Sequence, residues 1–298
     1  MAKADQHEFA DAVAKDLSEF PGVRTASPPI QNKEGDLTIV MVTPDGSPAS
    51  DETRDLVAAL RDRADEIPKD AGVEGLVTGT TALNIDTADQ LSAALPRYVV
   101  VVVGLALLLL TIVFRSLYVP IKAALGFMLS IAASLGVVVW IFQDGNLAEL
   151  FNVAQPGPVL SFLPILLIGI LFGLAMDYEV FLVSRMREHF VHTGKAREAV
   201  VTGYAQSGRV VIAAATIMIA VFAAFILDPS PITKSIGLSL AFGVLVDAFV
   251  VRLTLVPAVM TLLGRRAWGL PKRLERLVPD VDIEGERLAA RLNPSPAA

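Results

Sequence analysis

The 298-residue chain contains no cysteine, which excludes disulfide bonds, thiol catalysis and metal sites built from thiolates. It has only three histidines, His7, His189 and His192, and their spacing matches no metal-binding motif. The sequence also lacks a GxxxxGK[ST] phosphate loop and a recognisable Ser/His/Asp set. We therefore expect no enzyme, no metal site, no bound cofactor and no ATP-driven pump.

Charge is scarce and unevenly placed along the chain. Charged residues make up 19% of the sequence and hydrophobic residues 53%, which is too apolar for an ordinary soluble domain. Residues 1–96 hold 18 acidic and 8 basic side chains, whereas residues 97–298 hold 13 acidic and 17 basic ones. This composition excludes a disordered chain and a nucleic-acid-binding protein, and it indicates two physically different halves.

Five long apolar stretches occupy the second half of the sequence. They cover residues 98–114, 119–142, 162–183, 210–227 and 236–263. A bilayer core about 30 Å thick needs roughly 20 helical residues, and only helices or closed barrels satisfy their backbone hydrogen bonds in lipid. The sequence therefore predicts an α-helical integral membrane protein, with five transmembrane helices in residues 97–264.

The distribution of Lys and Arg predicts the orientation of these helices. Five basic residues lie in residues 184–209 and five in residues 265–276, whereas residues 143–161 have none and residues 228–234 have one. Cytoplasmic loops are enriched in basic residues. We therefore expect a multi-pass protein of the bacterial cell membrane, with residues 1–96 outside and a disordered cytoplasmic tail at residues 265–298.

Residues 1–96 are expected to form an extracytoplasmic α/β module. Apolar periodicity predicts a helix at residues 9–20, a strand at 37–42 and a second strand at 75–78. Ser50 is a candidate N-cap for a further helix between the strands. One small core gives such a module marginal stability, so we expect it to dock against another copy or a partner.

Ionisable residues inside the apolar stretches are the strongest functional signal in the sequence, because a charge in the membrane is costly and usually faces protein or water. Four lie deep inside the stretches: Asp177, Glu179, Asp247 and Arg252. For Asp177 a proton-carrying role and a structural ion pair with Arg252 are the alternatives. Glu179 lies about 200° around the helix from Asp177, which favours an interfacial or cavity-lining position.

Two of these residues end a series of small residues at four-residue spacing, which places each series on one helix face. Gly169 and Gly173 lead to Asp177, and Ser239 and Gly243 lead to Asp247. Such faces allow close helix packing, so both aspartates are expected to face protein. For Asp247 a structural ion pair with Arg252, which is near in sequence, is one alternative. The two residues are five apart, or about 140° around an α-helix, which favours a partner on another helix for each.

Several runs of the sequence resemble the mycobacterial membrane protein large family, MMPL, a branch of the resistance-nodulation-division transporters. The runs are GLAMDYEVFLVSRMREH (173–189), GRVVIAAATIMIAVFAAF (208–225), GVLVDAFVVRLTLVPAVM (243–260), FRSLYVPIKAA (114–124) and TGTTALNIDTADQL (78–91). The resemblance covers nearly the whole chain.

This resemblance implies a proton-driven exporter of lipids or other hydrophobic compounds, with twelve spans and two porter modules outside the membrane. It implies that Asp177 and Tyr178 belong to a central Asp-Tyr proton relay, and that Asp247 and Arg252 give it electrostatic support. The family pattern includes a first half that these 298 residues do not match. We therefore expect a missing N-terminal half or a second polypeptide as partner, besides the bilayer and a hydrophobic substrate.

The alternative hypothesis is a non-transporting membrane subunit, or an orphan fragment, that displays a binding module outside the cell. The two hypotheses differ in whether another polypeptide supplies seven further spans and a second Asp-Tyr pair. The identity of the substrate does not follow from this sequence.

Overall fold

The structure is a computed structural model that describes residues 3–48, 50–67, 73–153, 156–157 and 159–270. The chain divides into two compact units, Met1–Ser92 and Ala93–Ala298. We describe each unit separately.

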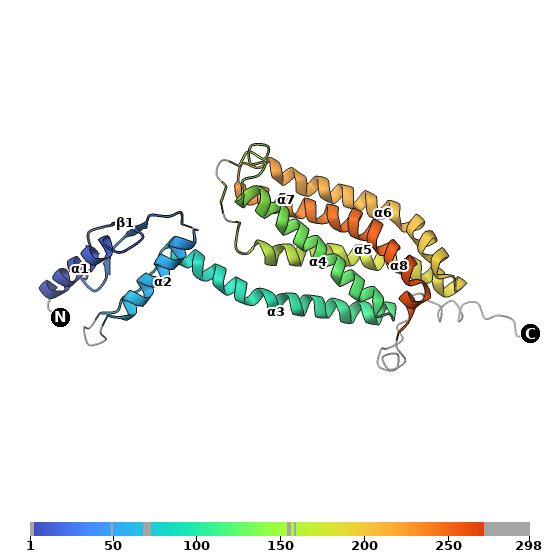
Figure 1. The fold of residues 1–298 in the computed structure, drawn as a ribbon, viewed down its shortest axis with the longest axis horizontal. Coiled ribbons are helices and arrows are strands. Elements are labelled where there is room, and N and C mark those ends of the chain that lie inside the picture. Colours follow the sequence, from blue (N-terminus) through green and yellow to red (C-terminus); the bar gives the residue numbers. More distant parts are fainter. Residues whose placement is uncertain (1–2, 49, 68–72, 154–155, 158, 271–298) are drawn as a thin grey trace, which may run out of the picture. The chain divides into compact units, whose positions relative to one another are not determined.

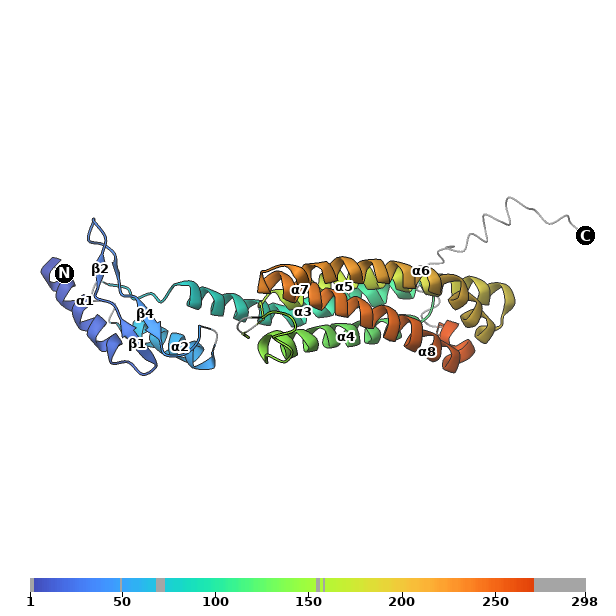
Figure 2. The ribbon, with the colours of Figure 1, turned by 90° about the horizontal axis from the view of Figure 1, so that it is seen from above.

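The first unit combines two helices with very short strands (Figures 1 and 2). Its elements are α1 (Lys3–Ser18), β1 (Val23–Ala26), β2 (Ile30–Gln31), β3 (Thr38–Ile39), β4 (Val42–Pro44) and α2 (Asp51–Asp65), followed by the first turns of α3 (Thr80–Phe114). β1 pairs with β4 and β2 pairs with β3, both antiparallel, so each sheet has only two strands.

The two predicted helices of this unit are confirmed. Ser50 caps α2, and its hydroxyl accepts a hydrogen bond from the Thr53 N–H at 3.3 Å, which satisfies one of the free donors of the first turn. The small core gathers Leu56 and Leu60 of α2 around Val23 of β1. It holds few large residues, in keeping with the limited core expected for this length.

The predicted strands of the first unit are mostly wrong. Residues 37–42 do not form one strand, because the chain changes pairing partner between β3 and β4; at this point the Ser27 hydroxyl accepts the Met41 N–H at 2.9 Å. Residues 75–78 form no strand. Val77 packs instead into the small clusters around α2, so its apolar character reflects burial without a strand partner.

The second unit is a helical bundle (Figures 1 and 2). It contains the rest of α3, then α4 (Tyr118–Val138), α5 (Leu163–Thr193), α6 (Ala196–Ala224), α7 (Pro231–Leu245) and α8 (Val256–Leu263). π-helical turns extend α4 through Val139–Gln143 and join α7 to α8 through Val246–Leu255. Within the described residues, five helices are long and apolar enough to cross a membrane, as predicted.

The last of these helices lies at the centre of the bundle. In its most apolar stretch 67% of the residues are buried, against 11% in α6, and α7 packs against α4, α5 and α6. Ser239 and Gly243 lie on its buried face. A Cβ atom on Gly243 would come within 2.6 Å of Leu171 Cδ1, so this predicted packing face makes close contact with α5.

The expectation of a disordered tail from residue 265 fails for its first residues. Residues Gly264–Trp268 form a short 3₁₀ helix. Trp268 stacks on Phe190 of α5 with ring centroids 5.3 Å apart, and the Ala267 carbonyl accepts a hydrogen bond from Ser116 at 2.6 Å. These contacts hold the segment to the bundle. The rest of that prediction, for residues 271–298, lies outside the described residues.

Candidate functional site: a buried charge network and an exposed aspartate

Glu179 is the centre of a buried charge network. One of its carboxylate oxygens lies 2.7 Å from Nζ of Lys122 on α4, and the other lies 2.6 Å from a terminal guanidinium nitrogen of Arg252. The Glu179 and Arg252 side chains are each 1% exposed. The expected interfacial or cavity-lining position of Glu179 is therefore wrong, because two cations from neighbouring helices enclose its carboxylate inside the bundle.

Asp247 joins the same network through Arg252. Arg252 Nε lies 2.8 Å from Asp247 Oδ2, so the structural ion pair is present and the expectation that Asp247 finds its partner on another helix is wrong. The reason is the local backbone: residues Val246–Leu255 are π-helical, and a π-helix bonds residue i to i+5. Residues five apart therefore lie almost above one another, whereas an ideal α-helix would separate them by about 140°.

The network is electrically balanced and almost fully paired. Lys122 and Arg252 offset Glu179 and Asp247, and the Ser130 hydroxyl of α4 lies 3.4 Å from the second oxygen of Asp247. Burying a charge is tolerated when it is paired and hydrogen-bonded. The four side chains thus connect α4, α5 and the last helix at one level of the bundle.

Asp177 lies outside this network. Its side chain is exposed, and no hydrogen bond or ion pair joins it to another described residue. Gly173, one turn earlier on α5, is also exposed, and a Cβ atom there would find nothing within 4 Å. The described helices therefore do not cover the face that Gly173 and Asp177 share, although the sequence predicts that this face packs against protein.

Other described helices partly cover the rest of the α5 face that leads to Asp177. At Gly169, two turns before Asp177, a Cβ atom would lie 3.1 Å from the Tyr98 hydroxyl of α3. Tyr178 is half-buried, and its hydroxyl donates to Sδ of Met218 on α6 at 2.8 Å. Asp177 and Tyr178 are neighbours in sequence, but the carboxylate is exposed while the tyrosine turns toward α6.

Lys122 is the network member that the sequence analysis missed. It is the fourth residue of the apolar stretch 119–142, and a basic residue so near the end of a span is ordinarily assigned to the membrane surface. One feature of the sequence could have indicated that Lys122 is buried: it lies inside an apolar stretch that also contains evenly spaced small residues, which are typical of a helix face packed against protein. Among the described residues no cluster of His, Cys, Asp or Glu could hold a metal ion.

Comparison with known proteins shows which family this chain resembles. The sequence model of the MMPL family matches residues 1–281. Membrane protein YdfJ of Bacillus subtilis is 51% identical over 286 residues, which is 96% of this chain and 39% of YdfJ. The mycolic acid-containing lipids exporter MmpL11 of Mycolicibacterium smegmatis is 35% identical, over 92% of this chain and 28% of that protein.

The name of a third relative also states what it exports. The trehalose monomycolate exporter MmpL3 of Mycobacterium tuberculosis is 37% identical over 231 residues, which is 76% of this chain and 24% of MmpL3. The chain thus spans well under half the length of these relatives. With a family match over most of its length and five described helices long and apolar enough to cross a membrane, the chain belongs to the MMPL family of membrane transport proteins.

Proposed function

We propose that this chain is the C-terminal half of a proton-driven exporter of lipids or other hydrophobic compounds. Family membership supports lipid export, as do two relatives that are named as exporters of mycolic acid-containing lipids and of trehalose monomycolate. The proton gradient supplies the energy, and no cofactor takes part.

The observation that carries the proposal is the position of Asp177. A carboxylate within an apolar span is costly unless protein or water surrounds it, yet the described residues of this chain leave Asp177 exposed and without a hydrogen bond or ion pair. We assign the missing cover to the N-terminal half of the transporter. Asp177 then binds and releases the proton at the contact between halves, and the Tyr178 hydroxyl passes it on.

The charge network has a supporting role in this proposal. Arg252 pairs with both Asp247 and Glu179, and Lys122 pairs with the other oxygen of Glu179. Because these charges compensate one another, the network holds α5 in place without offering a free carboxylate. Asp177, the unpaired acid on the same helix, is then the residue left to exchange protons.

A transport assay tests the proposed function. The chain is reconstituted in liposomes together with an N-terminal half of the same family, and a pH gradient is imposed across the membrane. We expect extrusion of a fluorescent lipid analogue to depend on the gradient and to stop when a protonophore collapses it. Transport that does not depend on the gradient would contradict the proposal. If neither half moves the analogue, the orphan-subunit hypothesis is preferred.

The proposed topology places residues 1–96, as a porter-like module, outside the cell and the basic ends of the spans inside. Since the chain has no cysteine, single cysteines report on this without background. We expect Ser47→Cys and Asn152→Cys, both at exposed positions, to react with an impermeant maleimide in intact cells. Thr193→Cys, exposed at the end of α5, is expected to react only after lysis, and its labelling in intact cells would contradict the topology.

A further inference from the structure

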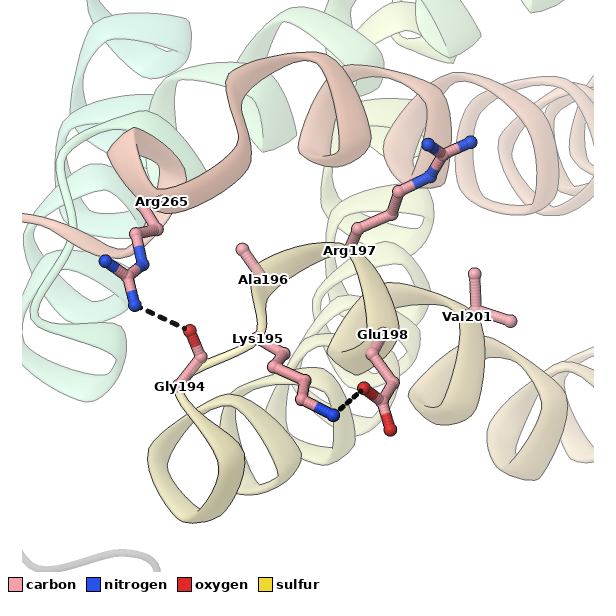
Figure 3. A pocket seen from close by; sticks show the side chains of 7 residues that line it. All are labelled: Gly194, Lys195, Ala196, Arg197, Glu198, Val201 and Arg265. Atoms are coloured by element: carbon pink, nitrogen blue, oxygen red, sulfur yellow. Dashed lines mark hydrogen bonds and ion pairs between the residues drawn. The ribbon is translucent and has the colours of Figure 1, made fainter.

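The turn between α5 and α6 carries an open hollow (Figure 3). Its volume is about 690 Å³. The lining residues come from the turn, the start of α6 and the segment after α8: Gly194, Lys195, Ala196, Arg197, Glu198, Val201 and Arg265. Three of the seven side chains are cationic and one is anionic.

Two of these three cations have no anionic partner among the described residues. Lys195 pairs with Glu198 at 2.9 Å, so these two charges offset each other. Arg265 donates to the Gly194 carbonyl at 3.2 Å, which orients its guanidinium but leaves its charge uncompensated. Arg197 points away from the Lys195–Glu198 pair in Figure 3, and no hydrogen bond or ion pair links it to another described residue. The hollow therefore suits an anionic occupant.

The hollow lies too far along the helices for that occupant to be a phospholipid headgroup. The apolar stretch of α5 ends at Val183, eleven residues before Gly194. At a rise of 1.5 Å per residue this is about 16 Å. The polar headgroup layer on each side of the hydrocarbon core is only about 5–8 Å thick. An acidic peptide in the aqueous phase fits the position better.

The sequence of the chain itself contains such a peptide. Residues 279–286, with the sequence PDVDIEGE, have four acidic side chains and no basic one. They begin fourteen residues after Arg265, and residues 271–298 lie outside the described part of the structure. A tether of fourteen residues can span about 20 Å, and such tethering gives an effective concentration on the order of millimolar.

We propose that the acidic segment 279–286 docks in this hollow and pairs with Arg197 and Arg265. Tethering makes a weak, screened set of ion pairs sufficient, because the segment does not have to be recruited from solution. Docking ties the C-terminal tail to the turn that joins α5 and α6. These are the helices that bear Asp177 and that accept the Tyr178 hydrogen bond, at Met218.

Cysteine crosslinking in the full chain tests this proposal. Val201→Cys is exposed at the hollow, and Ile283→Cys lies in the middle of the acidic segment; neither has a natural cysteine to compete with it. We expect a disulfide to form within one chain. It should form about ten-fold faster than in the double-cysteine variant that also carries Arg197→Glu and Arg265→Glu. Raising the salt concentration to 1 M should slow it as well, because the Debye length falls to about 3 Å.

Charge exchange provides the matched control. Reversing the tail alone, with Asp280→Lys, Asp282→Lys, Glu284→Lys and Glu286→Lys, should also slow the crosslink, and combining both reversals should restore it. The tail variant leaves every described residue unchanged, so the test does not depend on the stability of the bundle. A rate indifferent to both reversals, a disulfide only between two chains, or a crosslink that forms only with anionic lipid vesicles present would each overturn the proposal.

Discussion

Asp177→Asn should abolish gradient-driven export by the assembled transporter while leaving the stability of this chain nearly unchanged. The substitution keeps the size of the side chain and removes only its ability to bind and release a proton. Asp177 is exposed and has no hydrogen bond or ion pair among the described residues, so its replacement breaks no contact within this chain. A loss of transport at normal expression and thermal stability is the expected result, measured with the lipid analogue in liposomes.

Glu188→Gln is the matched control for this experiment. Glu188 is an exposed acid on the same helix, and its ion pair with Arg185 at 3.0 Å lies on the surface, where such pairs contribute about 0–1 kcal/mol. Both transport and stability should persist in this variant. If Asp177→Asn still exports the analogue at the normal rate under a pH gradient, the carboxylate has no part in the relay.

The largest effect on stability is expected from Arg252→Met. This substitution keeps an unbranched apolar side chain but leaves Asp247 without its ion-pair partner and Glu179 with Lys122 alone. Breaking a buried ion pair by removing one partner typically costs about 3–5 kcal/mol, because the remaining charge is buried without compensation. The free energy of unfolding, measured by denaturant titration in mixed micelles, should fall by an amount in that range.

Two further variants separate loss of charge pairing from loss of packing. Arg185→Met removes a surface guanidinium and should change the free energy of unfolding by about 1 kcal/mol or less. Adding Asp247→Asn to Arg252→Met removes the uncompensated carboxylate, while Glu179 keeps its ion pair with Lys122, and should recover part of the lost stability. An Arg252→Met protein as stable as the parent would show that the network does not hold the helices together.

The sequence by itself determined the features that depend on local composition and spacing. Runs of apolar residues long enough to cross a bilayer are a local property, so the number of spans is found correctly. The Ser50 cap and the small-residue face of Ser239 and Gly243 also follow from spacing, because an N-cap and a helix face each involve residues within a few turns. Asp177 was singled out in the same way.

The tertiary structure decided which charges meet. Asp247 and Arg252 come together because their segment is π-helical, a backbone change that α-helical periodicity does not reveal. Lys122 and Glu179 are 57 positions apart, and only the packing of α4 against α5 places their side chains 2.7 Å from each other. Strand pairing in the first unit has the same origin, since a strand forms only where a partner strand lies within hydrogen-bonding distance, and residues 75–78 have helices beside them.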